Sequence, residues 1–235
     1  MKKVFLVVAC AALLAAAQSC DMSKYNPQDD ELSNQIKILN ELTREQLEEQ
    51  GFALRLACAA DGESISFVVY SRKGDNCRWD AFDDDNTYAV FCNTADDAGW
   101  EYEYTAPTKA ATGDGWTEIG ATSAMVKVDA NYADLIGDAS DLLKDYGFSK
   151  TGTTKIFGLD CDVWSGTYTV PSGKSPVNVY GAMTLTEGTQ GEFCVWKGLT
   201  LRTSVNGKGQ TEMSGIVRNV PDKTFSKTLD LSWLK

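Results

Sequence analysis

Two glutamates on a predicted strand are the groups in this sequence best placed for acid–base chemistry. Glu101 and Glu103 alternate with aromatic residues in the stretch WEYEYT. Two residues of strand rise set their carboxyl groups roughly 6–7 Å apart on one face, which is compatible with paired acid–base chemistry on a sugar. Alternation places that face on the solvent side of a half-buried strand. We therefore expect a solvated face and predict no catalytic residue.

A run of aspartates from Asp83 to Asp85 could bind a calcium ion. A calcium-binding loop also needs a glycine at its bend and a glutamate further along, and this stretch lacks both. We expect a solvated acidic turn and predict no metal site.

The absence of histidine limits the catalytic chemistry of the chain. The 235 residues include no histidine, which removes the commonest general base, the Ser-His-Asp and Cys-His arrangements and the usual zinc ligands. The stretch SGKS resembles the end of a phosphate-binding loop, but Tyr168 stands where the first glycine is required and Pro176 blocks the following helix. We predict a turn there, no cofactor and no enzymatic activity.

Aromatic residues are the remaining candidates for a binding site. A row of them on one sheet face could stack a sugar or line an apolar cavity. The alternative is that they fill the core beneath the helices. The residues concerned are Trp79, Trp100, Tyr102, Tyr104, Trp116, Trp164 and Trp196.

The N-terminus is typical of a lipoprotein signal peptide over residues 1–19. Two lysines precede an apolar run from Val4 to Ala17, which is shorter than the roughly 20 residues that span a bilayer. The residues that end at Cys20 resemble a relaxed bacterial lipobox, in which the cysteine is lipidated. An ordinary signal-peptidase cut before Gln18 is the alternative.

Residues 20–32 then form the lipidated cysteine and a polar tether to the folded domain. Several acyl chains on Cys20 would hold the protein on a membrane. Asp21 favours the inner membrane under a rule known for some Gram-negative bacteria, which other groups do not follow. We favour the outer membrane and leave the periplasmic or surface side open. The net charge of −11 argues against nucleic-acid binding.

The chain has seven cysteines. One leaves with the signal peptide and Cys20 carries the lipid, so five remain in a protein exported to a compartment where disulfides form. Cys77 with Cys92 would close a hairpin-sized loop worth about 3 kcal/mol, and Cys161 with Cys194 is the other candidate pair. The alternative is that all five are small buried residues on strands.

Apolar periodicity predicts the elements that must position these residues. Amphipathic helices are expected over 33–50 and 132–146. Strands are expected over 52–58, 65–69, 77–80, 87–92, 100–105, 155–163, 177–186, 191–195, 199–205 and 210–218. Residues 33–235 therefore form one α+β domain, a strongly curved, mostly antiparallel, half-barrel-like sheet packed against two amphipathic helices.

Two motifs in the C-terminal half carry a family resemblance. They are a G-x-x-C-x-x-[WY] strand at Gly158, Cys161 and Trp164, and a W-K-G-x-x-L strand at Trp196, Lys197, Gly198 and Leu201. The chain thereby resembles a largely uncharacterised family of exported bacterial proteins, similar in fold to the periplasmic lipoprotein carriers and their outer-membrane receptor. This resemblance implies an antiparallel half-barrel, closed by helices, around an apolar pocket for acyl chains. It supplies no matching pocket residue.

These observations favour a membrane-anchored envelope lipoprotein without catalytic activity. We expect it to bind an acyl chain or another hydrophobic small molecule between the sheet and the helices that contain Leu39 and Leu135. One alternative is an interaction or structural lipoprotein with a filled core and a protein partner of unknown identity. Another is a carbohydrate-binding or carbohydrate-active surface lipoprotein that uses Glu101 or the acidic turn, with Trp100 as a stacking platform.

Overall fold

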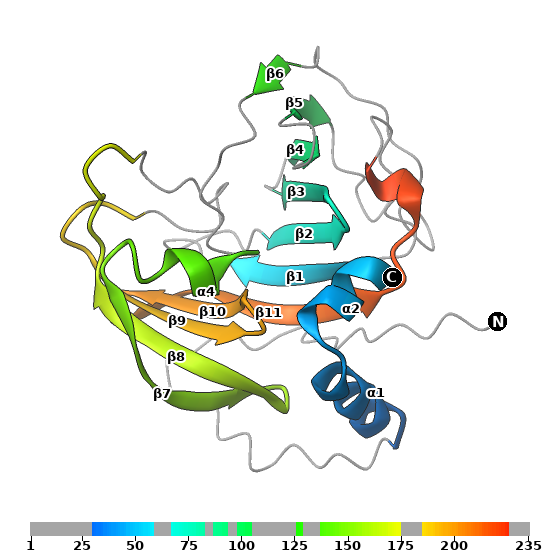
Figure 1. Cartoon of the computed structure of the whole chain (residues 1–235), viewed down its shortest axis with the longest axis horizontal. Coiled ribbons are helices and arrows are strands. Elements are labelled where there is room, and N and C mark those ends of the chain that lie inside the picture. The colour runs from blue at the N-terminus through cyan, green and yellow to red at the C-terminus, as the bar shows by residue number, and fades with distance from the viewer. Residues whose placement is uncertain are drawn as a thin grey trace.

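One antiparallel sheet carries most of the described chain. The computed structural model describes residues 30–58, 67–82, 87–93, 98–104, 126–128, 137–174 and 185–225. Eleven strands in these residues pair in the order β6-β5-β4-β3-β2-β1-β11-β10-β9-β8-β7 (Figure 1). β1 pairs with β2 on one side and with β11 on the other, so the two halves of the chain meet in the middle of the sheet.

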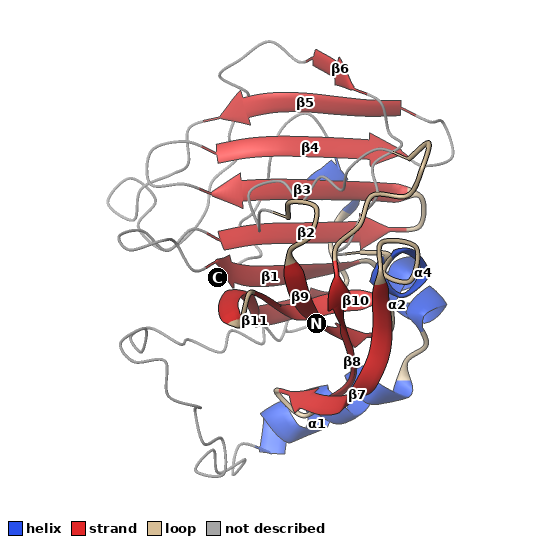
Figure 2. Ribbon diagram, turned by 90° about the vertical axis from the view of Figure 1, so that its left-hand side faces the viewer, coloured by secondary structure: helices blue, strands red, loops and turns tan. Residues whose placement is uncertain are grey.

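The first six strands run as consecutive neighbours from the middle of the sheet to one edge. They are β1 (Phe52–Cys58), β2 (Phe67–Lys73), β3 (Asn76–Phe82), β4 (Thr87–Asn93), β5 (Ala98–Tyr104) and β6 (Val126–Val128). Apolar alternation predicted the first five, with shifted ends, whereas β6 has no counterpart in the prediction. Figure 2 shows these strands as a ladder that extends away from the helices.

The second half of the sheet is built from hairpins. Its strands are β7 (Phe148–Ile156), β8 (Leu159–Thr167), β9 (Gln190–Trp196), β10 (Leu199–Val205) and β11 (Lys208–Arg218). Phe157 and Gly158 join β7 to β8 with φ angles of 48° and 82°, as the central residues of a type I′ turn require. The single strand expected over 155–163 is therefore wrong, because the chain reverses within it. Most of the strand expected over 177–186 lies outside the described residues.

The helix expected over 33–50 is divided into α1 (Asp30–Glu41) and α2 (Arg44–Gln50). Thr43 starts α2 with a capping box. Its hydroxyl accepts from the Gln46 amide at 3.2 Å, and the Gln46 side chain accepts from the Thr43 amide at 2.8 Å. This box satisfies the first donors of α2 locally, so the second helix begins independently of the first.

The second expected helix is wrong in length within the described residues. α4 (Ala139–Leu142) is a single turn, followed by further turns up to Gly147. Asp138 precedes α4 without capping it, because its carboxylate instead accepts two hydrogen bonds from Arg72. Leu135 lies outside the described residues. The curved, open, mostly antiparallel sheet is confirmed (Figure 1). The two amphipathic helices expected against it are not, and the described fold is mostly β rather than α+β.

Both edges of the described sheet have features that discourage pairing with another molecule. β6 is three residues long. The register of β7 with β8 shifts between Lys150 and Gly152, and Lys150 and Lys155 form ion pairs with aspartates of β8. Short, bulged and lysine-bearing edges oppose edge-to-edge aggregation.

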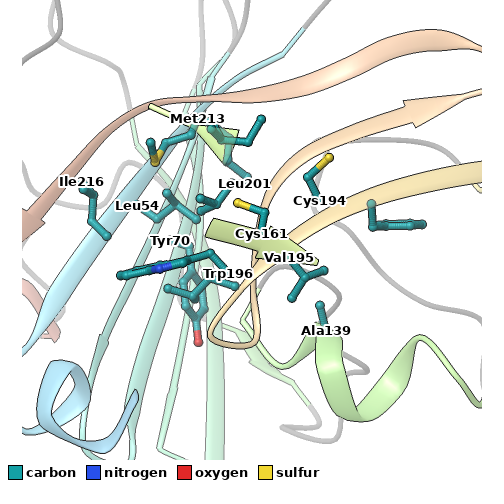
Figure 3. Packing of buried hydrophobic residues seen from close by; sticks show 14 of the residues in the cluster. Leu54, Tyr70, Ala139, Cys161, Cys194, Val195, Trp196, Leu201, Met213 and Ile216 are labelled. Carbon is teal, nitrogen blue, oxygen red and sulfur yellow. The ribbon is translucent and has the colours of Figure 1, made fainter. Parts of the chain in front are cut away.

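Buried apolar side chains from both halves of the sheet and from the helices form one core (Figure 3). Trp196 of β9 lies in it together with Leu54 of β1 and Tyr70 of β2. Met213 and Ile216 join from β11, across the junction where β1 and β11 pair. Side chains from the two halves of the sheet therefore pack in one shared core.

Candidate functional site

The space predicted to hold a hydrophobic ligand is occupied by packed side chains in the described part of the molecule. Leu39 of α1 is 3% exposed and belongs to one apolar cluster with the large aromatic residues of the sheet. Among these, the ring centroids of Phe52 and Tyr70 lie 6.0 Å apart, and those of Tyr70 and Trp79 lie 5.3 Å apart. Where the structure describes both, the helices and the sheet thus meet through packed side chains.

The Trp-Lys-Gly motif forms the turn between β9 and β10. Lys197 and Gly198 have φ angles of 49° and 80°, and Trp196 before them is 2% exposed in the core. The Lys197 ammonium group donates to the carbonyl oxygen of Asn40, at 3.0 Å, and to that of Leu42. These acceptors lie at the end of α1, where unsatisfied carbonyls and the helix dipole favour a cation. Lys197 therefore caps α1, and burial lowers its pKa.

The glycine of the other motif lies in the turn between β7 and β8, beside the same helix. Asn40 Nδ2 donates to the Gly158 carbonyl oxygen at 3.2 Å. A Cβ atom at Gly158 would lie 3.1 Å from Cγ2 of Ile36, so the Ile36 side chain packs over the bare glycine. Cys161 is buried, and Trp164 packs half-buried against the core. Both motifs therefore supply hairpin turns on which α1 lies.

Four charged residues fix α2 and the start of α4 to β2. Arg44 Nε and Arg72 Nε lie 2.7 Å and 3.1 Å from Oε1 of Glu48. Arg72 Nη1 lies 3.1 Å from Oδ1 of Asp138. Although burial opposes the charge of Arg72, Tyr70 and the two carboxylates hold its pKa well above the ordinary value. This cluster could not be predicted, because its members are far apart in the chain except for the Arg44–Glu48 helical pair.

A second buried ionic contact lies on β3. The side chains of Arg78 and Asp80 are both 0% exposed, and Nη2 of Arg78 lies 2.8 Å from Oδ1 of Asp80. Arg78 Nη1 also donates to the carbonyl oxygen of Thr224, at 3.4 Å. Thr224 belongs to the short helix η2 (Asp222–Phe225), so the pair connects β3 to the C-terminal part of the described chain.

The predicted cysteine pairs lie on neighbouring strands. Cys77 stands directly opposite Cys92 in the register of β3 with β4. Cys161 and Cys194 lie on β8 and β9 as buried free thiols. Burial raises the pKa of Cys161 to about 12 and also raises that of Cys194, whose sulfur accepts from Arg202 Nη2 at 3.3 Å. Both disulfides stay predictions, as does lipidation of Cys20, which lies outside the described residues.

Glu101 and Glu103, the candidate carboxylates of β5, are placed by its backbone register with β4. Register places Glu101 opposite Val90 and Glu103 opposite Tyr88. Val90 in turn stands opposite Trp79, a core residue, so the backbone register aligns Glu101 with the row of strand positions that contains Trp79. The solvated-face interpretation of the two glutamates stays a prediction. The aspartate run at 83–85 lies outside the described residues. Among those described, no group of three His, Cys, Asp or Glu side chains could hold a metal ion.

The stretch that resembles a phosphate-binding loop forms a turn up to Lys174, as predicted. Lys174 Nζ lies 2.5 Å from Oδ2 of Asp145. That hydrogen bond lowers the pKa of Asp145 and raises that of Lys174. The lysine is therefore engaged by a neighbouring carboxylate.

The aromatic candidates divide between the core and residues of which no side chain is described. Trp79 and Trp196 are 5% and 2% exposed members of the core, which confirms the core interpretation for both. Trp164 packs against that core. Trp100 lies on β5 with Tyr102 and Tyr104, placed by backbone pairing alone. Trp116 lies outside the described residues.

The described part of the chain folds as an open, curved antiparallel sheet with a packed apolar core and with helices docked on hairpin turns. No helix in the described residues is long and apolar enough to cross a membrane. No protein-family model and no curated protein matches the chain.

Among solved structures, the chain is similar to the crystal structure of MucB, with 14% identity and a TM-score of 0.33 over 88% of this chain and 64% of that chain. It is also similar to the MucA/MucB complex of Pseudomonas aeruginosa, with 14% identity and a TM-score of 0.32 over 82% of this chain and 60% of that one. The chain thus spans less than two thirds of the MucB chains that it matches. Similarity at this level assigns neither fold nor function, and the resemblance to lipoprotein carriers stays a prediction.

Proposed function

We propose that the protein is a non-catalytic lipoprotein of the cell envelope, tethered through Cys20, that binds another protein with its outer surface. The packing of the described helices on the sheet is the observation that carries this proposal. Leu39, Tyr70 and Trp196 lie buried in one apolar core where these helices and the sheet meet. Opening a close-packed interior loses the contacts of every side chain that lines it, whereas a partner on the surface leaves the core intact.

The N-terminal sequence also supports this proposal. The apolar run that ends at Cys20 and the polar tether after it indicate a protein held at a membrane. A tethered binding protein needs neither a general base nor a metal, which agrees with a chain that contains no histidine. We place it at the outer membrane.

Native mass spectrometry separates this proposal from the hydrophobic-ligand hypothesis. The mature chain, exported to the periplasm from Asp21 without its lipid, is measured intact and after organic extraction. We expect the mass of the polypeptide alone and no uptake of added fatty acid or phospholipid. A stoichiometric lipid released on unfolding would overturn the filled-core argument and favour a carrier.

Site-specific photo-crosslinking in cells tests the protein partner. A photoreactive amino acid is placed singly at three exposed residues on different elements: Glu45 on α2, Thr153 on β7 and Glu212 on β11. We expect one position to give a discrete crosslinked protein that excess purified domain displaces. The same position in a chain without the anchor, Cys20→Ser, shows whether membrane tethering is needed. No displaceable adduct at any position would contradict the proposal.

A further inference from the structure

The first helix is held to the domain differently from the second. Among the residues of α1 whose side chains are described, Leu39 alone is fully buried, whereas Ile36 is half-buried. The polar contacts of α1 go to hairpin turns and one strand: Lys197 to its last carbonyls, Asn40 to Gly158, and Arg218 to Gln35 at 3.2 Å.

α2 is fixed much more firmly. Leu47 is 0% exposed, and the Arg44–Glu48 pair is bound into the ionic cluster with Arg72 and Asp138 described above. The carbonyl oxygen of Glu48 also accepts from the amides of Gly51 and Gly74, at 3.2 Å and 3.0 Å. α2 is therefore continuous with β1 and the β2–β3 turn. α1 is joined to this network indirectly: the Lys197 carbonyl oxygen accepts from Arg44 at 3.3 Å, and Arg218 contacts both Gln35 and Gln50.

The break between the helices allows them to separate. The capping box of Thr43 and Gln46 satisfies the first amides of α2 from within α2 itself. Loss of α1 would therefore leave the start of α2 intact. The two turns that hold α1 contain non-glycine residues at positive φ, Phe157 and Lys197, a conformation that costs about 1–3 kcal/mol for such residues. The seat of α1 is thus strained, and Lys197 is its main polar contact.

We infer that α1 is a releasable strap: it detaches from the two hairpin turns as a unit while α2 and the sheet stay folded, and Lys197 is the latch. Local openings of this kind occur where few apolar contacts hold an element. The predicted tether leads into α1, which begins at Asp30. Where Cys20 is anchored, as the proposed function requires, a pull on the domain acts on the strap before it acts on α2.

Hydrogen-exchange mass spectrometry on the full mature chain in detergent tests the strap. We expect the amides of α1 to exchange through an opening that leaves α2 and β1 protected. Lys197→Met removes the charged donor, and it should speed exchange in α1 by roughly tenfold or more without changing α2. Lys150→Met is the matched control, because Lys150 pairs with Asp162 at the surface, near the end of β7 opposite the Phe157–Gly158 turn; it should change neither helix.

Asn40→Ala provides a second variant on the other turn, since it removes the donor to the Gly158 carbonyl. It should also speed exchange in α1 alone, by a smaller factor than Lys197→Met, because a neutral hydrogen bond contributes less than a charged one. Equal opening of α1 and α2 in the unmodified chain would overturn the inference. So would a Lys197→Met protein in which both helices exchange faster by the same factor. Neither result bears on whether a partner binds, so failure of the strap and failure of the proposed function are distinguishable.

Discussion

Asp80→Ala tests whether the buried ionic pair on β3 is a major determinant of stability. Asp80 and Arg78 are both 0% exposed. Arg78 Nε donates to Oδ2 at 2.9 Å and Nη2 donates to Oδ1 at 2.8 Å, a two-point contact. Removing the carboxylate takes these charged contacts away from a buried guanidinium, which also donates to the Thr224 carbonyl oxygen at 3.4 Å. Breaking a buried pair by deleting one partner costs about 3–5 kcal/mol.

Urea unfolding followed by circular dichroism measures this cost, and a thermal scan should show the melting temperature falling by about 6–20 °C for a domain of this size. Asp160→Ala is the control. Its carboxylate pairs with Lys155 at 2.8 Å but is 73% exposed, so its loss should cost at most about 1 kcal/mol.

A double replacement distinguishes ionic pairing from simple packing. Arg78→Met with Asp80→Leu removes both charges and keeps apolar volume, and it should recover most of the stability that Asp80→Ala loses. The reasoning is refuted if Asp80→Ala costs no more than Asp160→Ala, because the buried charge would then carry no penalty. It is also refuted if the double variant is less stable than Asp80→Ala.

Two further predictions concern the motif residues of the β7–β8 hairpin. Gly158→Val should destabilise the protein in urea by more than Gly207→Val. Both glycines have positive φ, 82° and 76°, but a Cβ at Gly158 meets Ile36 while one at Gly207 meets nothing within 4 Å. Equal losses of stability would show that the contact with α1 contributes nothing. Burial raises the pKa of Cys161 from 9.0 to about 12, so the folded thiol should resist alkylation near pH 9. The free energy of unfolding should fall as pH rises from about 9 to about 12, because the unfolded thiol loses its proton first. Cys161→Ala should reduce that fall, and an unchanged pH profile would contradict the raised pKa of Cys161.

Most strand positions could be predicted from the sequence because apolar and polar residues alternate along them. The exception is the β7–β8 hairpin. The reversal between β7 and β8 has phenylalanine at its first turn position, with φ of 48°, and phenylalanine is not typical of that conformation. Only Gly158 signals the turn in the sequence, and a single glycine in an alternating stretch also fits a continuous strand. The contact of Gly158 with Ile36 and Asn40 explains why the turn forms there.

The division of the first helix could have been read from the sequence but was hidden by its apolar spacing. Thr43 and Gln46 stand three residues apart, as a capping box requires. The apolar residues Leu42 and Leu47 continue the helical pattern across this point, since Leu42, in the link between the helices, packs against the core and Leu47 of α2 lies in it. Periodicity reports which side of the chain is buried, and it does not report where the backbone hydrogen bonds restart.

The buried ionic contacts could not be predicted, for a different physical reason. Alternation on β3 assigns Arg78 and Asp80 to the sheet face opposite the core residue Trp79. From the sequence alone, that face is predicted to be exposed to solvent. The pair is buried because η2 packs over that face, and Thr224 is 146 residues from Arg78 in the chain. Only the tertiary fold brings that cover to β3. The same holds for Asp138, 66 residues from Arg72.

The two family motifs take on a different meaning once the position of α1 is known. The sequence alone presents Lys197 and Gly198 as a tight bend and Cys161 as a strand residue, which is correct but incomplete. In the structure, the lysine caps the end of α1 and the glycine of the other motif receives Ile36 from the same helix. Lys197 and Gly158 thus serve contacts with an element more than a hundred residues earlier. A chain that contains both motifs should therefore contain a helix docked on two hairpin turns.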